Sequence, residues 1–448
     1  MKKFIILFCI CTACAGIDYT DRGLTGRTGF SDEIASAYTP AQEWWKGYND
    51  PELNRLVDMA LENNIDYAKS ALAVNRALYQ ANLAGLNLYP TLSGSLGAST
   101  SKDLTSGDSF RRSFSGELSL SYELDLYGKV GKARDMAELD YYATALDRET
   151  QGLVLVNSII EMYFNLAYLH GALKNTELNY ENYEKLHQIA KAKYDYGFSD
   201  SAGFMQAEQS LLSAQNSITE LNNQIKSAEQ TLRNLLNLTP GDELIVSYVD
   251  LMMVEPLGVN LDVPFAVLAE RPDLKAAEMR LERTYKNVQI QKRSWYPSIS
   301  LRTSISSSSE KVGTVFDFPF FSGGLSISLP FLSWNTVKNN IRISETDYES
   351  TLLGFEQTVN TALNEVAYYY YAYTTTGSLL ENAKLKHATD ERLTEYHQTR
   401  YMAGKVELSE LLGAINTENN SSRDVLNNIY QLIKYENTVF KALAGKWD

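Results

Sequence analysis

Apolar and polar residues alternate along two short segments of the chain, and each segment is predicted to form a β-hairpin. In the first, about 91–125, apolar residues from Leu92 to Leu124 alternate with serine and other small residues. The second, about 298–331, repeats this alternation. A period of two places successive side chains on opposite faces of a sheet. Each hairpin is therefore expected to have one apolar face and one small, polar face.

A helical period replaces the alternation outside the hairpins. Two stretches without proline, about 132–195 and about 339–402, would each extend about 95 Å as an α-helix. Gly197 and Gly404 follow them and predict sharp turns into returning helices. Apolar residues in the first returning helix are spaced alternately by three and four, which is typical of a coiled-coil seam. They are Leu211, Ala214, Ile218, Leu221, Ile225, Ala228, Leu232 and Leu235.

The second returning helix has a more polar seam. Glu418, Ser421 and Asn428 stand at positions where the first helix has apolar residues. Two explanations remain open at this stage. Either the helix packs beside a water-filled space, or its seam is simply looser.

The two halves of the chain are related by a constant offset. Tyr89-Pro90 aligns with Tyr296-Pro297, and Gly197 aligns with Gly404 (297 − 90 = 207 and 404 − 197 = 207). The offset holds from about residue 66 to about residue 414 without a gap. We therefore predict two tandem copies of one module. They are 51–240, with a helical hairpin at about 132–238, and 251–448, with a helical hairpin at about 339–445.

The N-terminus has the pattern of a secretory signal, predicted to cover residues 1–13. Lys2 and Lys3 precede an apolar run that is too short to span a membrane. Ala13-Cys14 resembles the site at which bacterial lipoproteins are cleaved and acylated, although Cys11 stands where leucine is usual. We expect 14–50 to be an extended segment lipidated at Cys14. Ordinary cleavage, with loss of Cys14, is the alternative.

The net charge of −14 argues against binding to nucleic acid, which requires basic patches. After the signal, no apolar run is expected to approach the roughly 18 residues that a membrane helix needs. A crossing of the membrane would therefore require a closed β-barrel. The two predicted hairpins supply four strands, and about eight are needed to close a β-barrel. Several chains would therefore have to share one barrel. A structural periplasmic coiled-coil protein without a pore is the alternative.

The sequence contains no pattern of catalytic residues, and we expect a protein that is not an enzyme and has no cofactor. The four histidines occur singly within the long helical stretches. No cluster has the spacing of a metal site.

Motifs along nearly the whole mature chain resemble those of one family. They are Trp44-Trp45, Asn49 to Leu53, Tyr122 to Lys129, Glu270 to Leu274, Tyr296 to Leu301 and Ala442 to Trp447. These motifs are similar to those of the outer-membrane factors, the TolC-like channels. Within that family the chain resembles the lipoprotein (NodT-type) branch of RND-type efflux systems.

The resemblance implies an α+β membrane protein. Three chains would form a trimeric 12-stranded outer-membrane β-barrel, four strands per chain, continuous with a long periplasmic α-helical barrel. Such a homotrimer is embedded in outer-membrane lipid and extends into the periplasm. It would conduct small molecules, such as drugs and toxic compounds, passively as the exit channel of a tripartite pump. Its partners would be a periplasmic adaptor and an inner-membrane RND-type transporter. A duct for protein secretion is the alternative function.

The resemblance also implies roles for residues at the two helical turns. The turns would dock the adaptor, and alignment on Gly404 places Glu410 at the first acidic position of the family's periplasmic gate. Glu407 is a second candidate, whereas Gly413 stands where some members have another acid. Three carboxylates around a narrow axis would repel one another and favour cations. The alternative is that both acids lie on a solvated helix face. The docking candidates are Gly197, Phe198, Ser199, Gly404, Lys405 and Val406.

Overall fold

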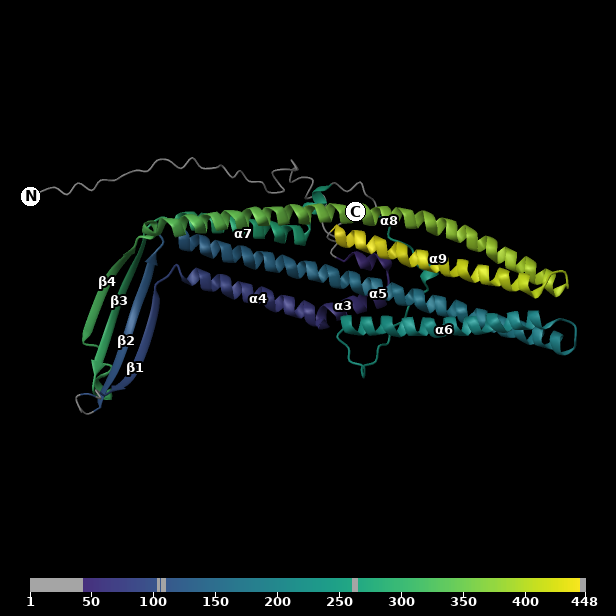
Figure 1. Ribbon diagram of the computed structural model, residues 1–448, viewed down its shortest axis with the longest axis horizontal. Coiled ribbons are helices and arrows are strands. Elements are labelled where there is room, and N and C mark those ends of the chain that lie inside the picture. The colour runs from purple at the N-terminus through teal and green to yellow at the C-terminus, as the bar shows by residue number, and fades with distance from the viewer. Residues whose placement is uncertain (1–42, 103–104, 106–109, 260–264, 444–448) are drawn as a thin grey trace, which may run out of the picture.

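The protein is an elongated molecule with a β-sheet at one end and long helices along the rest (Figure 1). The computed structural model describes residues 43–102, 105, 110–259 and 265–443. Cys14, the signal and most of the segment 14–50 lie outside these residues. The first half contains η1 (Trp44–Tyr48), α3 (Pro51–Asn63), α4 (Ile65–Leu86), β1 (Thr91–Ser101), β2 (Arg111–Leu124), α5 (Lys129–Asp195) and α6 (Ser201–Leu235). The second half contains η2 (Leu251–Met253), η3 (Phe265–Glu270), α7 (Pro272–Arg293), β3 (Ser298–Ser309), η4 (Val312–Thr314), β4 (Phe320–Ser328), η5 (Pro330–Ser333), α8 (Trp334–Met402) and α9 (Leu408–Ala442).

The tandem repeat predicted from the sequence is confirmed in the fold. Adding 207 to the bounds of α4 gives 272–293, the bounds of α7, and adding it to those of α6 gives 408–442, the bounds of α9. One element departs from the repeat. The counterpart of α3 would span 258–270, but the described residues 265–270 of that stretch form the 3-10 helix η3 and not an α-helix. That stretch contains Gly258 and Pro264, which disfavour a continuous α-helix.

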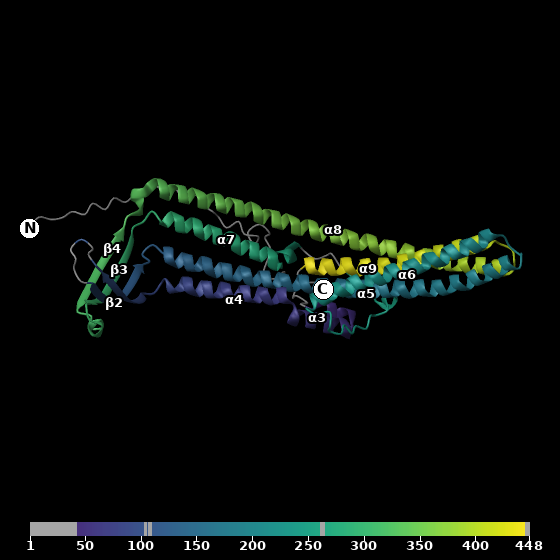
Figure 2. The same ribbon diagram turned by 60° about the horizontal axis from the view of Figure 1, so that its bottom comes forward.

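The sheet and the helices form one curved layer with two open edges. The strands are antiparallel in the order β1-β2-β3-β4. Near the sheet the helices follow in the order α4-α5-α7-α8 (Figure 2). At the far end they follow in the order α6-α5-α9-α8 (Figure 1). Strands β1 and β4 therefore each have a partner on one side only, and α4, α6 and α8 border the helical layer.

The two faces of the sheet differ as the alternation predicts. Register places Leu96, Gly116 and Ser307 on one face, together with the leucine and isoleucine side chains. The apolar side chains of this face are largely exposed in the single chain. Among them are Leu92, Leu96, Leu118, Leu120, Leu301, Ile305, Phe321, Leu325 and Ile327.

The core is built around α5, which contacts α3, α4, α6, α7 and α9. An 18-residue window of α5 is apolar enough, by length and composition, to cross a membrane. The expectation that no such run follows the signal is therefore wrong. The apolar character of α5 has a packing cause, because 56% of that window is buried and it holds core residues such as Ile159 and Phe164.

Helix α9 is packed on two sides. It contacts both α8 and α5, and it buries Ser421 of its polar seam together with a second row that includes Ile429 and Phe440. Both explanations of the polar seam stay predictions. Residues outside the coiled-coil spacing supply a second contact face, which a single seam does not predict.

A polar cluster ties the start of the described chain to α9. The indole N–H of Trp44 donates to Asn437 Oδ1 (2.9 Å), and the Tyr48 hydroxyl donates to Glu436 Oε2 (2.6 Å). The backbone N–H of Gly258 donates to Glu436 Oε1 (2.7 Å). Burial raises the pKa of the Glu436 carboxyl, although these hydrogen bonds oppose the shift. The cluster fixes η1 and the segment between the repeats beside the C-terminal helix.

Candidate functional site at the helical tips

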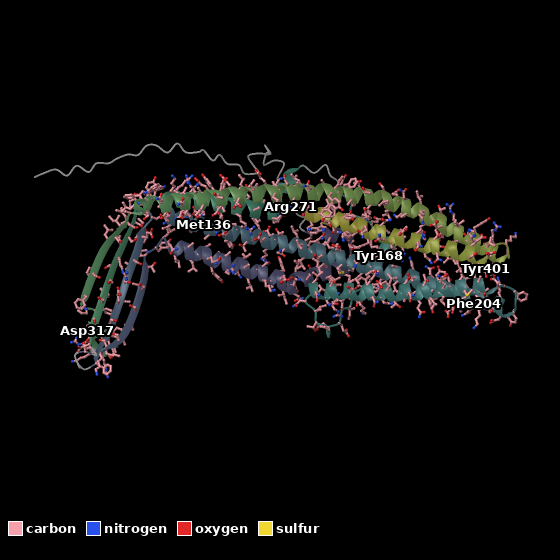
Figure 3. All side chains as sticks on the ribbon, in the orientation of Figure 1. Met136, Tyr168, Phe204, Arg271, Asp317 and Tyr401 are labelled. Atoms are coloured by element: carbon pink, nitrogen blue, oxygen red, sulfur yellow. The ribbon has the colours of Figure 1, made fainter. Side chains whose placement is uncertain are left out.

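The two helical hairpins turn at the end of the molecule farthest from the sheet. Figure 3 labels Tyr401 and Phe204 at this end and Asp317 at the distal end of the sheet. We call residues 196–200 and 403–407 the first and second tips. They are the turns that the sequence analysis identified from their glycines.

Both tips have the same backbone structure. Gly197 and Gly404 have φ of 75° and 70°, in the left-handed region that favours glycine. Phe198 N–H donates to Lys193 O (2.8 Å) and Gly197 N–H to Tyr194 O (2.9 Å). The second tip repeats both bonds at equivalent residues. Each turn is thus a Schellman motif, which satisfies the last carbonyls of the helix and ends it sharply.

Large side chains project from the tips. Phe198 is 82% exposed, and Tyr196 and Met402 are similarly exposed. Of the other docking candidates, Gly197, Ser199, Gly404 and Lys405 are exposed and Val406 is half-buried. All six candidates therefore lie together at one end of the protein, and the apolar ones have few contacts there.

The residues that begin the returning helices differ between the tips. Asp200 caps α6, because its carboxylate accepts a hydrogen bond from Ala202 N–H (3.1 Å). Glu407 occupies the equivalent position of α9 but makes no cap hydrogen bond. Its carboxylate is exposed and accepts only a long bond from the Ser409 hydroxyl (3.4 Å). Glu407 therefore presents its charge to solvent.

A contact between α5 and α8 joins the two hairpins just before the tips. Lys193 Nζ donates to the Tyr401 hydroxyl (3.2 Å) and lies 4.5 Å from the centre of the same ring. Tyr401 is buried, at 7% exposure. A groove of about 460 Å³ beside this contact is lined by both tips, including Phe198, Val406 and Glu407. Next to the tips, the first and second hairpins are therefore joined by a contact between one cation and one aromatic ring, in addition to the packing of α9 on α5 farther along.

Glu410 lies on the first turn of α9 and is half-exposed. Its Oε2 is 3.7 Å from Nδ1 of His397 on α8, and the pair is ionic only when the histidine is protonated. Gly413, one turn farther along, is exposed and has open space around it. The structure thus brings Glu407 and Glu410 to the same end of one helix.

Lys193, Tyr401 and His397 belong to this region but were not predicted from the sequence to do so. The repeat offset contains a signal for the first two, since Lys193 aligns with Arg400 and Tyr194 with Tyr401 directly before the two glycines (400 − 193 = 207). No comparable signal marks His397. Within the described residues, no group of three or more potential metal ligands comes together.

Comparison with known proteins identifies the family to which this fold belongs. The profile of a family described as outer membrane efflux protein matches residues 56–238 and 263–445, two segments offset by 207. The chain is 43% identical to an uncharacterized protein of Haemophilus influenzae, over 92% of this chain and 91% of that protein. It is 40% identical to toxin and drug export protein A of Aggregatibacter actinomycetemcomitans, over 98% of this chain and 96% of that protein.

A solved structure has the same fold. The CmeC outer membrane channel of Campylobacter jejuni superposes with a TM-score of 0.82 at 24% identity, covering 91% of this chain and 88% of that one. The family match covers both copies of the tandem repeat, and the superposition covers the fold of long helices and four strands. The chain therefore belongs to the outer membrane efflux protein family, and it is a non-enzymatic efflux channel of the outer membrane that extends into the periplasm.

Proposed function

We propose that three copies of the chain close into one channel, with a 12-stranded β-barrel in the outer membrane and a helical tunnel in the periplasm. The observation that carries this proposal is the pair of open edges. Within the part of the chain that the structure describes, strands β1 and β4 each lack a second partner. In lipid such an edge costs several kcal/mol for each unpaired backbone group, so it must be closed by another strand. The β4 strand of a neighbouring copy would pair with β1. The number of copies, three, is taken from the family resemblance.

The helices at the same edges support this closure. On α4, exposed apolar residues recur at spacings of 7, 7, 4 and 3, which is one stripe along the helix. These are Ile65, Leu72, Tyr79, Leu83 and Leu86. Exposed residues of α8 also fall on one side of that helix at a helical period. These are Ile343, Leu353, Tyr368, Tyr371, Leu379, Leu385, Leu393 and Tyr396. Packing α8 of one copy on the next copy's α4 and α6 would cover both stripes.

Aromatic residues support the placement of the sheet in the membrane. Tyr127 and Tyr296 stack where the sheet meets the helices (4.6 Å between ring centres), and Trp334 is exposed nearby. Phe316 and Phe321 are exposed toward the opposite end. Two aromatic girdles that flank an apolar band are typical of outer-membrane barrels. The apolar face would therefore contact lipid, and acylation of Cys14 would add a second anchor.

The channel would be the passive exit duct of a tripartite pump. The tips point away from the sheet, so they would meet a periplasmic adaptor, and an inner-membrane RND-type transporter would supply the energy. The conducted solutes would be small toxic molecules and drugs. Export of larger toxins is a second candidate, because the relative that is 40% identical is a toxin and drug export protein by name.

Glu410 and Glu407 would form the gate at the periplasmic end. In a trimer each would occur three times around the axis, and like charges close together repel and favour cations. The Lys193–Tyr401 contact would hold the two hairpins of each chain together in the closed state. Opening would then require the second hairpin to move away from the first.

We expect Glu410→Ala to increase the single-channel conductance in planar bilayers and to reduce the preference for cations. The change should be larger at 0.1 M salt than at 1 M, because the screening length falls from about 10 Å to about 3 Å. Asp424→Ala is the matched control, since Asp424 is an exposed acid farther along the same helix. A protein that conducts in neither form would contradict the channel. Equal effects of both substitutions would contradict the gate.

We expect photoreactive residues at Ser199 and Lys405 to capture a periplasmic adaptor in living cells. Both side chains are exposed at the tips, where an adaptor would approach. Lys311 is the control position, because it is also exposed but lies in the turn between β3 and β4. The captured partners would be identified by mass spectrometry. Capture of the same protein from all three positions, or of none from the tips, would contradict docking at this end.

A further inference from the structure

The polar face of the sheet is lined mainly by hydroxyl groups. Register places every second residue of each strand on this face, beginning with Thr91 in β1 and Ser298 in β3. Most of these positions are serine. Glycine occupies Gly97 and Gly324, and Phe320 of β4 is the one apolar exception among the described strands. The serines are Ser93, Ser95, Ser99, Ser101, Ser113, Ser115, Ser119, Ser121, Ser298, Ser300, Ser304, Ser306, Ser308, Ser322, Ser326 and Ser328.

Hydrogen bonds between strands confirm that these hydroxyls share a face. Ser93 and Ser119 are bonded at 2.8 Å, and Ser304 and Ser322 at 2.9 Å. Each hydroxyl both donates and accepts. A surface of this kind can replace some of the water around a solute of either charge, and it has no net charge of its own.

Four charged side chains interrupt the hydroxyl surface of the described strands, and they sum to zero. Arg111 lies at the start of β2, Glu123 near its end, and Glu117 and Arg302 between them. Arg302 Nη2 is 3.5 Å from Glu117 Oε1, across the β2–β3 pair. Both side chains are solvent-accessible, at 68% for Arg302 and 40% for Glu117. The charges near the middle of the face therefore cancel within one chain.

We propose that the Glu117–Arg302 pair makes the wall of the barrel electrically neutral, so that the barrel passes solutes without selecting their charge. This inference rests on the proposed function, in which the polar face lines the barrel. A single charge acts over about a screening length, roughly 10 Å at 0.1 M salt, whereas the field of a closely spaced opposite pair decays much faster. Charge selection is then left to the acidic residues at the periplasmic tips. The solutes that such a barrel admits include cationic, anionic, zwitterionic and uncharged small molecules.

The test measures the potential at the wall by thiol labelling. The three cysteines of the chain are Cys9, Cys11 and Cys14, so a cysteine introduced into the sheet is the only thiol there. Ser304→Cys places it on the polar face, two residues from Arg302. A cationic and an anionic methanethiosulfonate reagent are added outside cells at low salt, and both labelling rates are divided by those for a free thiol. These reagents enter from the outer side, so labelling does not require an open tip.

We expect the ratio of the cationic to the anionic rate to be close to one in the Ser304→Cys protein. Arg302→Gln should raise the ratio, because Glu117 is left uncompensated, and Glu117→Gln should lower it. The double substitution should restore the original ratio, and Arg302→Lys should leave it unchanged. Equal ratios in both single variants, with Ser304→Cys still labelled, would overturn the neutral pair and leave the barrel intact.

A second reporter separates this outcome from failure of the barrel itself. Thr303→Cys lies one residue away on the apolar face, where lipid should protect it from both reagents. Labelling of Thr303→Cys without labelling of Ser304→Cys would show that the faces are reversed. That result would overturn the proposed orientation of the barrel and the inference with it. The amount of each variant in the outer membrane is measured in parallel, so that labelling is compared per folded protein.

Discussion

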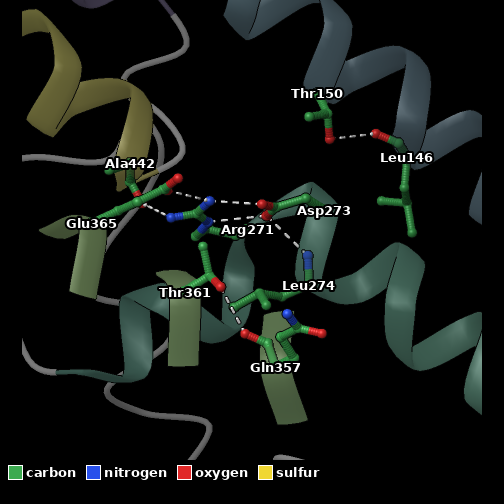
Figure 4. A network of polar contacts seen from close by, with 9 residues as sticks. All are labelled: Leu146, Thr150, Arg271, Asp273, Leu274, Gln357, Thr361, Glu365 and Ala442. Atoms are coloured by element: carbon green, nitrogen blue, oxygen red, sulfur yellow. Dashed lines mark hydrogen bonds and ion pairs between the residues drawn. The ribbon is translucent and has the colours of Figure 1, made fainter. Parts of the chain in front are cut away.

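Replacing Arg271 by methionine is expected to lower the free energy of unfolding by about 3–5 kcal/mol. The guanidinium is 8% exposed and lies between the start of α7, the middle of α8 and the end of α9 (Figure 4). It donates to both carboxylate oxygens of Asp273 (2.6 and 2.9 Å). It also donates to Glu365 Oε2 and to the carbonyl of Ala442, each at 3.2 Å. Methionine fills similar space but leaves these acceptors without their donor. Removing one partner of a buried ion pair destabilises a protein more than replacing both partners by apolar residues.

The matched control is Arg280→Met on the same helix. Arg280 pairs with Asp147 of α5, but both side chains are nearly half-exposed, so its loss should cost no more than about 1 kcal/mol. Urea unfolding of the detergent-solubilised proteins, followed by circular dichroism, measures the difference. Coincident midpoints for the two variants would show that the Arg271 cluster does not hold the three helices together.

The same cluster predicts a direction of pH dependence. Burial alone would raise the pKa of the Asp273 carboxyl, but the hydrogen bond and charge of Arg271 outweigh it and hold this pKa below its ordinary value. A carboxyl whose pKa is lower in the folded state than in the unfolded state stabilises the fold at a pH above its unfolded pKa, which is about 3.9 for aspartate. The contribution is lost as the pH falls through the pKa of the folded state. We expect the advantage of the wild type over Arg271→Met to shrink in this acidic range.

The elements and their order could be predicted from the sequence because each has a local signal. Alternation marks the strands, and the absence of proline allows the long helices. Gly197 and Gly404 mark the turns, since a left-handed residue is needed there. The 207-residue offset adds a second signal, because an element in one half of the chain predicts an element 207 residues away in the other half. It even places α7 and α9 at the residues where they occur.

The contacts between distant elements had no such signal. Lys193 and Tyr401 are 208 residues apart, and Arg271 and Ala442 are 171 apart. A polar residue in a helical stretch has the same appearance in the sequence whether it faces solvent or a partner. The second contact face of α9 was missed for a related reason, because the coiled-coil spacing describes one neighbour and α9 has two. The site at the tips could therefore be located from the sequence, but the contacts between its hairpins could not.

An arginine in β3 is expected to be tolerated on the polar face of the barrel but to destabilise the protein on the apolar face, one position away. Arg302 is tolerated on the polar face, beside Glu117. Leu301→Arg would place the same side chain on the apolar face, where register groups Leu301 with Tyr122 and Leu325. Near the bilayer midplane an arginine facing lipid costs about 2–4 kcal/mol per chain. Since every chain of the assembly carries the substitution, the cost recurs in each third of a trimeric barrel.

The control is Ser300→Arg, one position to the other side of Leu301. Ser300 faces the polar side opposite Glu123, so an arginine there keeps its water and gains a possible counter-charge. We expect Leu301→Arg to reduce the amount of assembled channel in the outer membrane and to lower its urea midpoint, and Ser300→Arg to leave both near the wild-type values. Equal losses in the two variants would mean that both faces are equally intolerant of charge, as in a sheet packed against protein. Because the two substitutions introduce the same side chain at adjacent residues, a larger loss in Leu301→Arg is the result expected if that residue faces lipid and Ser300 faces water.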